Sequence, residues 1–211
     1  MPSVHVRSGA LPPPLPPLAG LDAEHISALH WEAMGQPGWP RQRAALPHGL
    51  LQGVAENHRC NALLWEHQEA LGHAPQREDR AALLQALEDC NRRRNDAIAA
   101  LDEALLAALP PPEPGAPPPA ESVGALVDRL SINALKIFHL GLQLQRPDAC
   151  EAQLGGCADK LAQLRLQRAQ LMYELDELLR RLAAGELSGR FDRSFRPYRD
   201  PVLDPCAGCA S

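Results

Sequence analysis

Residues 121–145 read ESVGALVDRLSINALKIFHLGLQLQ, and this stretch decides the fold class of the chain. Its apolar residues recur every three or four positions, which is the spacing of one face of an α-helix. They are Val123, Leu126, Val127, Leu130, Ala134, Ile137 and Phe138. Glu121 and Ser122 precede this run and supply a helix cap. A helix that is apolar around most of its circumference is normally central in its fold.

The same stretch carries a polar stripe on the other side of the predicted helix. Successive residues are about 100° apart around a helix axis, so polar side chains that are far apart in sequence share one side. They are Asp128, Lys136, His139 and Gln143, with Ile132 among them. This stripe is either a narrow window onto solvent or the wall of an internal polar site, and the sequence leaves both interpretations open.

Four further stretches show helical periodicity, and glycine or proline marks their ends. They run from Asp22 to about Met34 and over about 47–71, 77–109 and 158–184. Pro147 and the pair Gly155-Gly156 predict a loop before the last helix. No stretch alternates apolar and polar residues as a strand does. The predicted fold is therefore all-α, a bundle of four main long helices with a short N-terminal one.

Two proline-rich stretches interrupt the helices. Residues 1–20 contain ALPPPLPPLAG, which predicts an extended or disordered tail, and residues 110–120 read PPPEPGAPPPA, which predicts a stiff, exposed connector. Each side of this connector has too few helices to cover its own apolar stripes. We therefore expect a single domain over residues 21–205 that includes the connector, followed by a flexible C-terminal tail over 206–211.

Charge and composition exclude several classes of protein. The formal net charge of −5 argues against a nucleic-acid surface, which needs a basic excess. No apolar run approaches the 18 residues of a membrane span, and the N-terminal stretch lacks the apolar region of a secretory signal. The six cysteines form no recognisable disulfide framework. These observations predict a cytoplasmic protein without a membrane span.

Polar side chains interrupt three otherwise apolar helix stripes. Asn61 lies in one stripe, Asn91 and Arg94 in the next, and Arg168 in the leucine-rich stripe of the last helix. Burying an uncompensated amide costs about 2–7 kcal/mol, so each group needs a partner. The partners are either carboxylates, for which Asp96, Asp102, Asp128 and Asp176 are candidates, or an anionic ligand. The first alternative is a structural network of Arg–Asp pairs, and the second is a binding site.

Metal and cofactor patterns are weak in this sequence. His58 and His67 are nine residues apart, which is not a ligand spacing on one helix face. Cys206 and Cys209 form a lone CxxC without the second pair that a zinc site needs. Cys60 and Cys90 have the positions of small core residues. We therefore expect no metal site and no cofactor.

The run ESVGALVDRLSINALKIFHL, residues 121–140, resembles the signature of an uncharacterised bacterial helical family, a domain of unknown function. The hallmark of that family is a TPGxLIDRLSILxLKIYHM-like run. Weaker similarity in NALLW, NRRRND, QRAQL and FRPYRDPVLDP extends the resemblance over about 21–205. Where the family has a WHxED-like run, this chain reads WEHQE, so an acid or metal role does not carry over to Gln68. Members tend to be encoded beside glycosyltransferases of lipopolysaccharide or surface-polysaccharide assembly, which implies that context here.

Two hypotheses for the function follow. In the first, the internal polar site binds, or acts on, an anionic sugar or sugar phosphate of envelope polysaccharide synthesis. The candidate roles are anion clamps for Arg94 and Arg168, a third cation for Lys136, hydroxyl readers for Asn61 and Asn91, and acid–base groups for Asp128 and His139. In the second, the protein is a non-catalytic partner or scaffold that docks on glycosyltransferases, or on copies of itself, through helix faces. Burial separates the two: the first expects Arg94, Lys136 and Arg168 in one open pocket, and the second expects them dry and paired.

Overall fold

The computed structural model describes residues 18, 20–42, 49–74, 76–145 and 151–189, with no side chains described at 151–154. Over these residues it contains helices and no strands, which confirms the predicted all-α class. The helices are α1 (Ala23–Met34), α2 (Leu50–His73), α3 (Arg77–Ala108), α4 (Val123–Leu144) and α5 (Glu151–Ala183). None of these helices combines the length and the apolar character that a membrane span requires.

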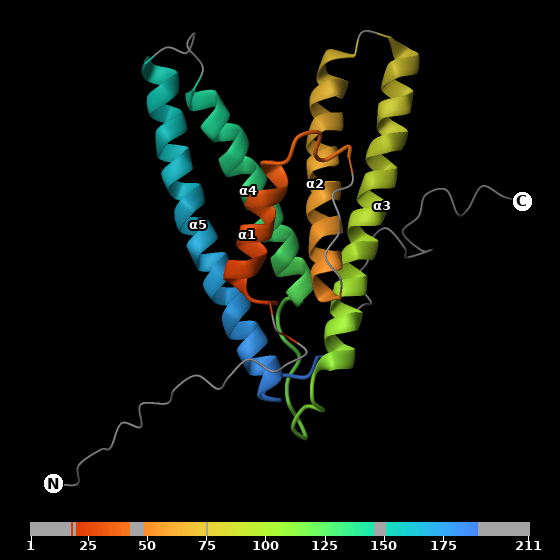
Figure 1. Cartoon of the computed structure of the whole chain (residues 1–211), viewed down its shortest axis with the longest axis vertical. Coiled ribbons are helices and arrows are strands. Elements are labelled where there is room, and N and C mark those ends of the chain that lie inside the picture. Colours follow the sequence, from red (N-terminus) through yellow and green to blue (C-terminus); the bar gives the residue numbers. More distant parts are fainter. Residues whose placement is uncertain (1–17, 19, 43–48, 75, 146–150, 190–211) are drawn as a thin grey trace, which may run out of the picture.

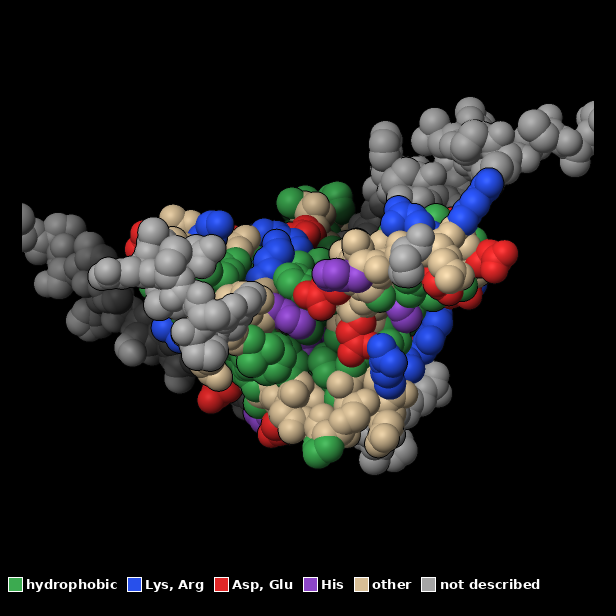
Figure 2. All heavy atoms as spheres, turned by 90° about the horizontal axis from the view of Figure 1, so that it is seen from above, with side chains coloured by type: hydrophobic (Ala, Val, Ile, Leu, Met, Phe, Trp, Pro, Cys, Tyr) green, Lys and Arg blue, Asp and Glu red, His purple; other side chains and the backbone are tan. Residues whose placement is uncertain are grey.

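Two antiparallel hairpins, α2–α3 and α4–α5, form the body of the molecule (Figure 1). They lie close together at the lower end and diverge toward the upper end, while the short α1 packs between them on α2, α4 and α5. Seen from above, the middle of the molecule shows hydrophobic side chains next to histidine, acidic and basic ones (Figure 2). The hairpins therefore separate toward a surface of mixed character.

α4 is the central helix, as its sequence predicts. It contacts each of the other four helices, and half of its residues are buried. The hydrophobic core lies around its first three turns and includes Ile26, Leu105, Val123, Val127, Leu130, Leu171 and Leu175. Leu18, which falls within the predicted tail, is only 7% exposed and packs into this core. Residues 1–17 and 19 of the predicted tail lie outside the described residues.

Side-chain caps begin the two helices for which the sequence predicts them. Asp22 accepts a hydrogen bond from the backbone N–H of His25 at 2.9 Å, and Ser122 accepts one from Ala125 at 3.1 Å. Asp102 of α3 adds a further contact, because its Oδ1 accepts the backbone N–H of Gly124 at 2.8 Å. The start of α4 is thus held both by its own cap and by the neighbouring helix.

The loop predicted at Gly155-Gly156 is wrong, because both glycines lie inside α5. A glycine costs about 1 kcal/mol in a helix interior relative to alanine, so it weakens a helix without ending it. Both glycines are exposed, and the leucine stripe that follows packs the rest of α5 against α4. This packing outweighs the cost of two glycines in one turn.

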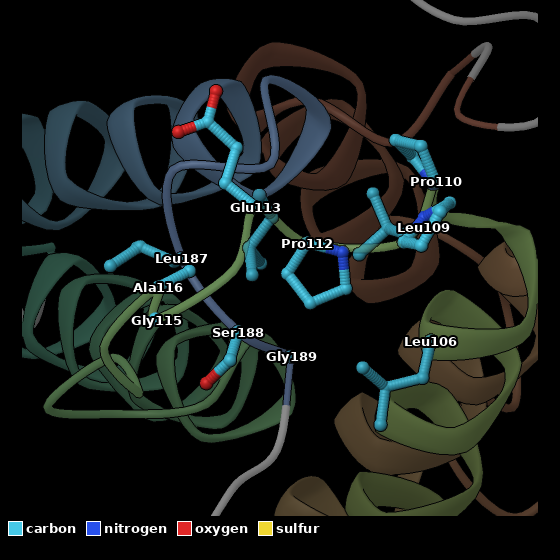
Figure 3. Close-up of a pocket in the computed structure, with 12 residues that line it drawn as sticks. Leu106, Leu109, Pro110, Pro112, Glu113, Gly115, Ala116, Leu187, Ser188 and Gly189 are labelled. Atoms are coloured by element: carbon cyan, nitrogen blue, oxygen red, sulfur yellow. The ribbon is translucent and has the colours of Figure 1, made fainter.

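The connector of residues 110–120 is largely exposed, as predicted, and it is also hydrogen-bonded to the chain that follows α5. The backbone N–H of Glu113 donates to the carbonyl of Gly185 at 3.0 Å, and that of Ser188 donates to Pro117 at 2.9 Å. Gly185 has φ of 73° and ends α5, which confirms the predicted helix stop. Connector, α3 and this segment border a cavity of about 510 Å³ lined by leucine and proline (Figure 3).

The close approach of α3 and α4 at Gly124 generates a first prediction. A Cβ at Gly124 would lie 2.7 Å from the carbonyl oxygen of Ile98, so Gly124→Ala should lower the free energy of unfolding by about 1–3 kcal/mol. Gly141 lies in the same helix with nothing within 4 Å of its Cβ position, and Gly141→Ala should instead raise stability by up to about 1 kcal/mol. Urea unfolding of the two variants checks both signs. A Gly124→Ala variant as stable as Gly141→Ala would rule out this close contact.

Candidate functional site

Ten polar side chains meet where all five helices approach one another, and we call this group the polar layer. It consists of Ser27 and His30 from α1, Asn57, His58 and Asn61 from α2, Asn91 and Arg94 from α3, Asp128 and Ser131 from α4, and Arg168 from α5. Most of its members are buried, while Asn91 and Arg94 form its half-buried edge.

Asp128 is the centre of the polar layer and is 5% exposed. Arg94 donates two hydrogen bonds to its carboxylate, from Nε to Oδ1 at 2.8 Å and from Nη2 to Oδ2 at 2.6 Å. The amides of Asn57 and Asn61 each donate to Oδ1 at 2.9 Å. The hydrogen bond to Asp128 raises the pKa of Arg94 although burial opposes this. The pair is therefore neutralised and its oxygens are satisfied within the protein.

A directed chain of hydrogen bonds leads from Asn61 to His58. The Asn61 amide donates to Ser131 Oγ at 3.0 Å, and Ser131 Oγ lies 2.8 Å from His58 Nδ1. His58 Nε2 lies 3.2 Å from the carbonyl oxygen of His30. A carbonyl only accepts hydrogen bonds, so Nε2 carries the proton and Nδ1 accepts from Ser131. This assigns the neutral Nε2–H tautomer to His58.

His30 has the most isolated imidazole in the polar layer. It is fully buried, and neither of its ring nitrogens has a hydrogen-bond partner among the described residues. Its ring stacks on His58 at 4.3 Å between centroids, and Trp39 also stacks on His58 at 4.9 Å. Burial lowers the pKa of His58 to about 3, and burial, His58 and Arg168 hold the pKa of His30 well below its usual 6.5. Both imidazoles are therefore neutral near pH 7.

Arg168 is 7% exposed and forms no ion pair with any described carboxylate. It donates to the carbonyl of Leu130 at 3.2 Å and to Ser27 Oγ at 2.7 Å, and its guanidinium lies 5.4 Å from the centre of the Trp31 ring. Burial lowers the pKa of Arg168. The expected Arg–Asp pairing thus holds for Arg94, whereas Arg168 is stabilised by neutral oxygens and an aromatic face.

Lys136 does not join the polar layer, although the sequence places it at a similar depth, and it is exposed. Asp128 and His139 are also apart, because eleven residues separate them along α4, which is about 16 Å of helix rise. The hairpins diverge along α4 (Figure 1). The stripe that is interior at Asp128 is exposed at Lys136, about two turns later, and half-buried at His139, about three turns later. Of the residues predicted to form one site, Asn61, Asn91, Arg94 and Asp128 are in direct contact, and Arg168 lies at the opposite end of the polar layer.

Lys136 and His139 instead line a cavity of about 630 Å³ between the hairpins, which we call the inter-hairpin groove. It is formed by Trp65 and Glu69 from α2, Lys136, His139, Leu140 and Gln143 from α4, and Lys160, Gln163, Leu164 and Gln167 from α5. Its volume lies in the range of about 300–1,000 Å³ that is usual for small-molecule sites.

Aromatic rings and unpaired cations characterise this groove. The rings of Trp65 and His139 stack in parallel, with centroids 4.3 Å apart and an interplanar angle of 7°, and Trp65 Nε1 donates to Glu69 Oε1 at 2.8 Å. Lys136 and Lys160 form no ion pair with the described residues. They are also the only two lysines in the chain, in which arginine is the commoner permanent cation. The groove is therefore lined by two lysines, one from α4 and one from α5, that have no ion-pair partner among the described residues.

A family model describes this chain. It covers residues 51–190, which is about two thirds of the chain, and its description is "Protein of unknown function (DUF4254)". The chain belongs to the DUF4254 family. Comparison with curated proteins and with solved structures finds no match. The DUF4254 region contains α2 to α5 and the whole inter-hairpin groove, while α1 precedes it and adds Ser27 and His30 to the polar layer.

Several residues that the structure places in the polar layer or the groove are not among those predicted from the sequence. Asn57 and Ser131 each lie one turn from a predicted site residue, so their helical spacing could have included them. Lys160 carries a different signal, because it is one of only two lysines. His30 and Ser27 carry none, since the same short helix contains exposed polar residues from which the sequence does not distinguish them.

The cysteine and metal predictions have separate outcomes. Cys60 and Cys90 are buried free thiols, which confirms them as small core residues, and burial raises the pKa of Cys60 to about 12. The described residues contain no group of three or more His, Cys, Asp and Glu side chains that is placed to hold a metal ion. Cys206 and Cys209 lie outside the described residues.

The two arginines of the polar layer should respond differently to substitution. Arg94→Met strands the buried Asp128 carboxylate and should cost about 3–5 kcal/mol. Arg168→Met removes a buried cation without stranding an anion, so it should stay within about 1.5 kcal/mol of the parent. Chemical denaturation of both variants at pH 7.5 measures the difference. An equal loss in both would mean that Arg168 also has a charged partner.

The buried histidines make stability depend on pH. His30 and His58 have native pKa values far below 6.5, so below that pH the unfolded chain binds protons that the native state excludes. Their contribution is absent above pH 6.5 and destabilises the fold as pH falls toward about 3. The two histidines together should lower the free energy of unfolding by about 2–3 kcal/mol between pH 7.5 and pH 5.5.

His30→Leu isolates this effect, because the His30 ring has no hydrogen bond among the described residues to lose. The variant should match or exceed the parent's stability at pH 7.5 and lose about half of the acid sensitivity. His25→Gln, which changes an exposed histidine, is the control. Parallel stability curves for parent and His30→Leu would contradict a neutral buried His30.

Proposed function

We propose that the protein binds an anionic sugar or sugar phosphate in the inter-hairpin groove and acts in cell-envelope polysaccharide or lipopolysaccharide biosynthesis. The observation that carries this proposal is the convergence of both lysines of the chain, Lys136 and Lys160, on one groove where neither has a described ion-pair partner. Exposed cations that are not neutralised from within the protein are available to an anionic ligand.

The other side chains of the groove suit the rest of a sugar. Gln143, Gln163 and Gln167 present amides, which both donate and accept hydrogen bonds as hydroxyl groups do. Leu140 and Leu164 supply apolar surface beside the stacked rings of Trp65 and His139. A concave site with apolar walls and a few convergent polar groups is the usual form of a small-molecule site.

The polar layer is a weaker candidate for the same ligand. Asp128 accepts four hydrogen bonds from protein side chains, and Arg94 is already bound to it in a bidentate pair. A ligand anion would have to displace a carboxylate from Arg94 in a buried setting, which would strand that carboxylate. The roles proposed for Asn61, Asn91, Arg94, Asp128 and Arg168 are therefore structural: they fix how the helices meet below the groove.

The biosynthetic context rests on a separate observation. The run at residues 121–140 resembles a family signature whose members tend to be encoded beside glycosyltransferases, and DUF4254 membership adds no activity to this. An anionic sugar ligand fits that context, because lipopolysaccharide and surface polysaccharides contain phosphorylated and acidic sugars.

A second candidate function is docking on a glycosyltransferase as a non-catalytic partner. The observation in its favour is the outer face of α5, where Leu166 and Tyr173 are 73% and 67% exposed and lie two turns apart on the same side. Large apolar side chains at such exposure are a feature of protein contact sites. Neither residue lines the groove, so the two functions make separate predictions.

Amine-selective acylation tests the groove, because the chain has only two lysine amines. Glucose 6-phosphate and glucose 6-sulfate should protect Lys136 and Lys160 from acylation, as read by mass spectrometry, while neutral glucose should not. At a concentration of about 100 times Kd, either anion should stabilise the fold by about 2.7 kcal/mol. Both measurements belong at low, fixed ionic strength because salt screens exposed charges.

The double variant Lys136→Gln/Lys160→Gln should bind the sugar sulfate at least tenfold more weakly, since it removes both free cations. Arg92→Gln/Arg165→Gln removes the same net charge from exposed positions outside the groove and serves as the matched control. Equal affinity for the sugar sulfate in the two double variants would overturn the groove as the binding site. The Arg92→Gln/Arg165→Gln control should also keep the protection of Lys136 and Lys160 from acylation. Absence of any anion-dependent protection would overturn the proposed function and favour docking on a partner protein.

A further inference from the structure

We infer that His139 becomes the third cation of the inter-hairpin groove by taking up a proton from solvent when an anionic ligand binds beside Lys136 and Lys160. This inference rests on the proposed function. It adds that protonation of His139 favours an anionic ligand over a neutral one. It assigns His139 as a binding residue that is neutral in the free protein and positively charged in the complex.

The position of His139 allows this change. Its ring is half-buried, lines the groove and has no hydrogen bond with the described residues, so its nitrogens are not committed to any partner among them. Lys136 lies three residues earlier on the same face of α4, and Lys160 faces the groove from α5. An anion held between the two lysines therefore lies next to the imidazole.

The Trp65 ring is placed to stabilise a positive charge on His139. The two rings are parallel with centroids 4.3 Å apart, so an imidazolium would lie over the face of an indole, where a cation is attracted by the ring quadrupole. Glu69 holds the indole through the hydrogen bond from Nε1 at 2.8 Å. This stack fixes the imidazole in place and stabilises its charged form.

The free protein nevertheless keeps His139 neutral near pH 7. Burial lowers the pKa of His139, and Glu69 and Glu66 of α2 only partly oppose this. Lys136 on its own helix and Lys160 on α5 line the same groove, so an imidazolium would be a third positive charge there. An arriving anion attracts the imidazolium and thereby opposes the effect of burial.

The size of the coupling follows from simple electrostatics. An anion about 5 Å from the ring at an effective dielectric constant of about 40 favours the imidazolium by about one pKa unit. Binding should then take up at most about half a proton per ligand, at a pH between the pKa values of the free and the bound imidazole, and affinity should rise up to about tenfold as pH falls through them. A neutral sugar does not favour the charged ring, so protonation discriminates against it.

Calorimetry with glucose 6-sulfate tests this inference, because the charge of a sulfate ester does not change over this pH range, whereas a phosphate ester has a second pKa near 6. Titrations in two buffers with different ionisation enthalpies give the number of protons taken up per ligand. The parent should take up a fraction of a proton per ligand at pH 6.2 and almost none at pH 8. The His139 ring proton shifts, followed by NMR with and without the probe, should show its pKa rise on binding.

His139→Gln should keep the pH 8 affinity within about threefold of the parent, lose the proton uptake and bind equally well at pH 6.2 and pH 8. His25→Gln, which changes an exposed histidine outside the groove, should behave as the parent does. Binding of the sulfate with no proton uptake in the parent, or uptake that survives in His139→Gln, would overturn the role of His139 and leave the groove intact. No binding at either pH would overturn both this inference and the proposed function.

Discussion

The ion pair between Arg94 and Asp128 is the constraint on which the rest of the structure depends. It joins α3 to α4, and the amides of Asn57 and Asn61 bring α2 to the same carboxylate. A buried carboxylate that lost these donors would be strongly unfavourable, so any slip of one helix along another is penalised at this point. Apolar side chains tolerate small shifts, whereas a bidentate pair with fixed geometry does not. The polar layer thus sets the level at which the two hairpins meet, and the hydrophobic core packs around the first three turns of α4.

The same stripe of α4 has two environments because the hairpins diverge above this level. At Asp128 the stripe is enclosed by α2 and α3, and at Lys136 and His139 it faces the groove between α2 and α5. The layer is closed and balanced: Asp128 is paired, the imidazoles of His30 and His58 are neutral, and Arg168 is held by neutral oxygens and the Trp31 ring. The groove is open and carries a positive excess. Rigidity at the layer therefore supports a binding surface about two to three turns further along α4, and a binding site benefits from fixed walls.

Much of this architecture is predictable from the sequence, and the failures have physical causes. Helical periodicity and the caps at Asp22 and Ser122 identify the helices, and polar residues within apolar stripes identify Asn61, Asn91 and Arg94 as neighbours of Asp128. Periodicity reports the angle of a residue around its helix and not the distance between helices, so it placed Lys136 at the depth of Arg94. The partners of Arg168 are a carbonyl, a hydroxyl and an aromatic ring, and none of these is marked in the sequence by complementary charge. Whether a buried cation is balanced by a carboxylate or by dipoles is decided by tertiary contacts that local pattern does not contain.

Arginine and lysine have different roles in the polar layer and in the groove. The chain places arginine in fixed contacts, such as the bidentate pair of Arg94 and the contacts of Arg168 to α1 and α4, and keeps both of its lysines for the groove. A guanidinium presents a planar fork whose geometry suits a permanent partner, whereas an ammonium is a compact, strongly hydrated charge on a flexible stem. A lysine ammonium is therefore better suited than a guanidinium to reversible binding, because it is rehydrated when the ligand leaves. His139 differs from both, because its positive charge is present only when a bound anion stabilises it. A permanent third cation would repel the lysines in the empty groove, and a conditional one does not.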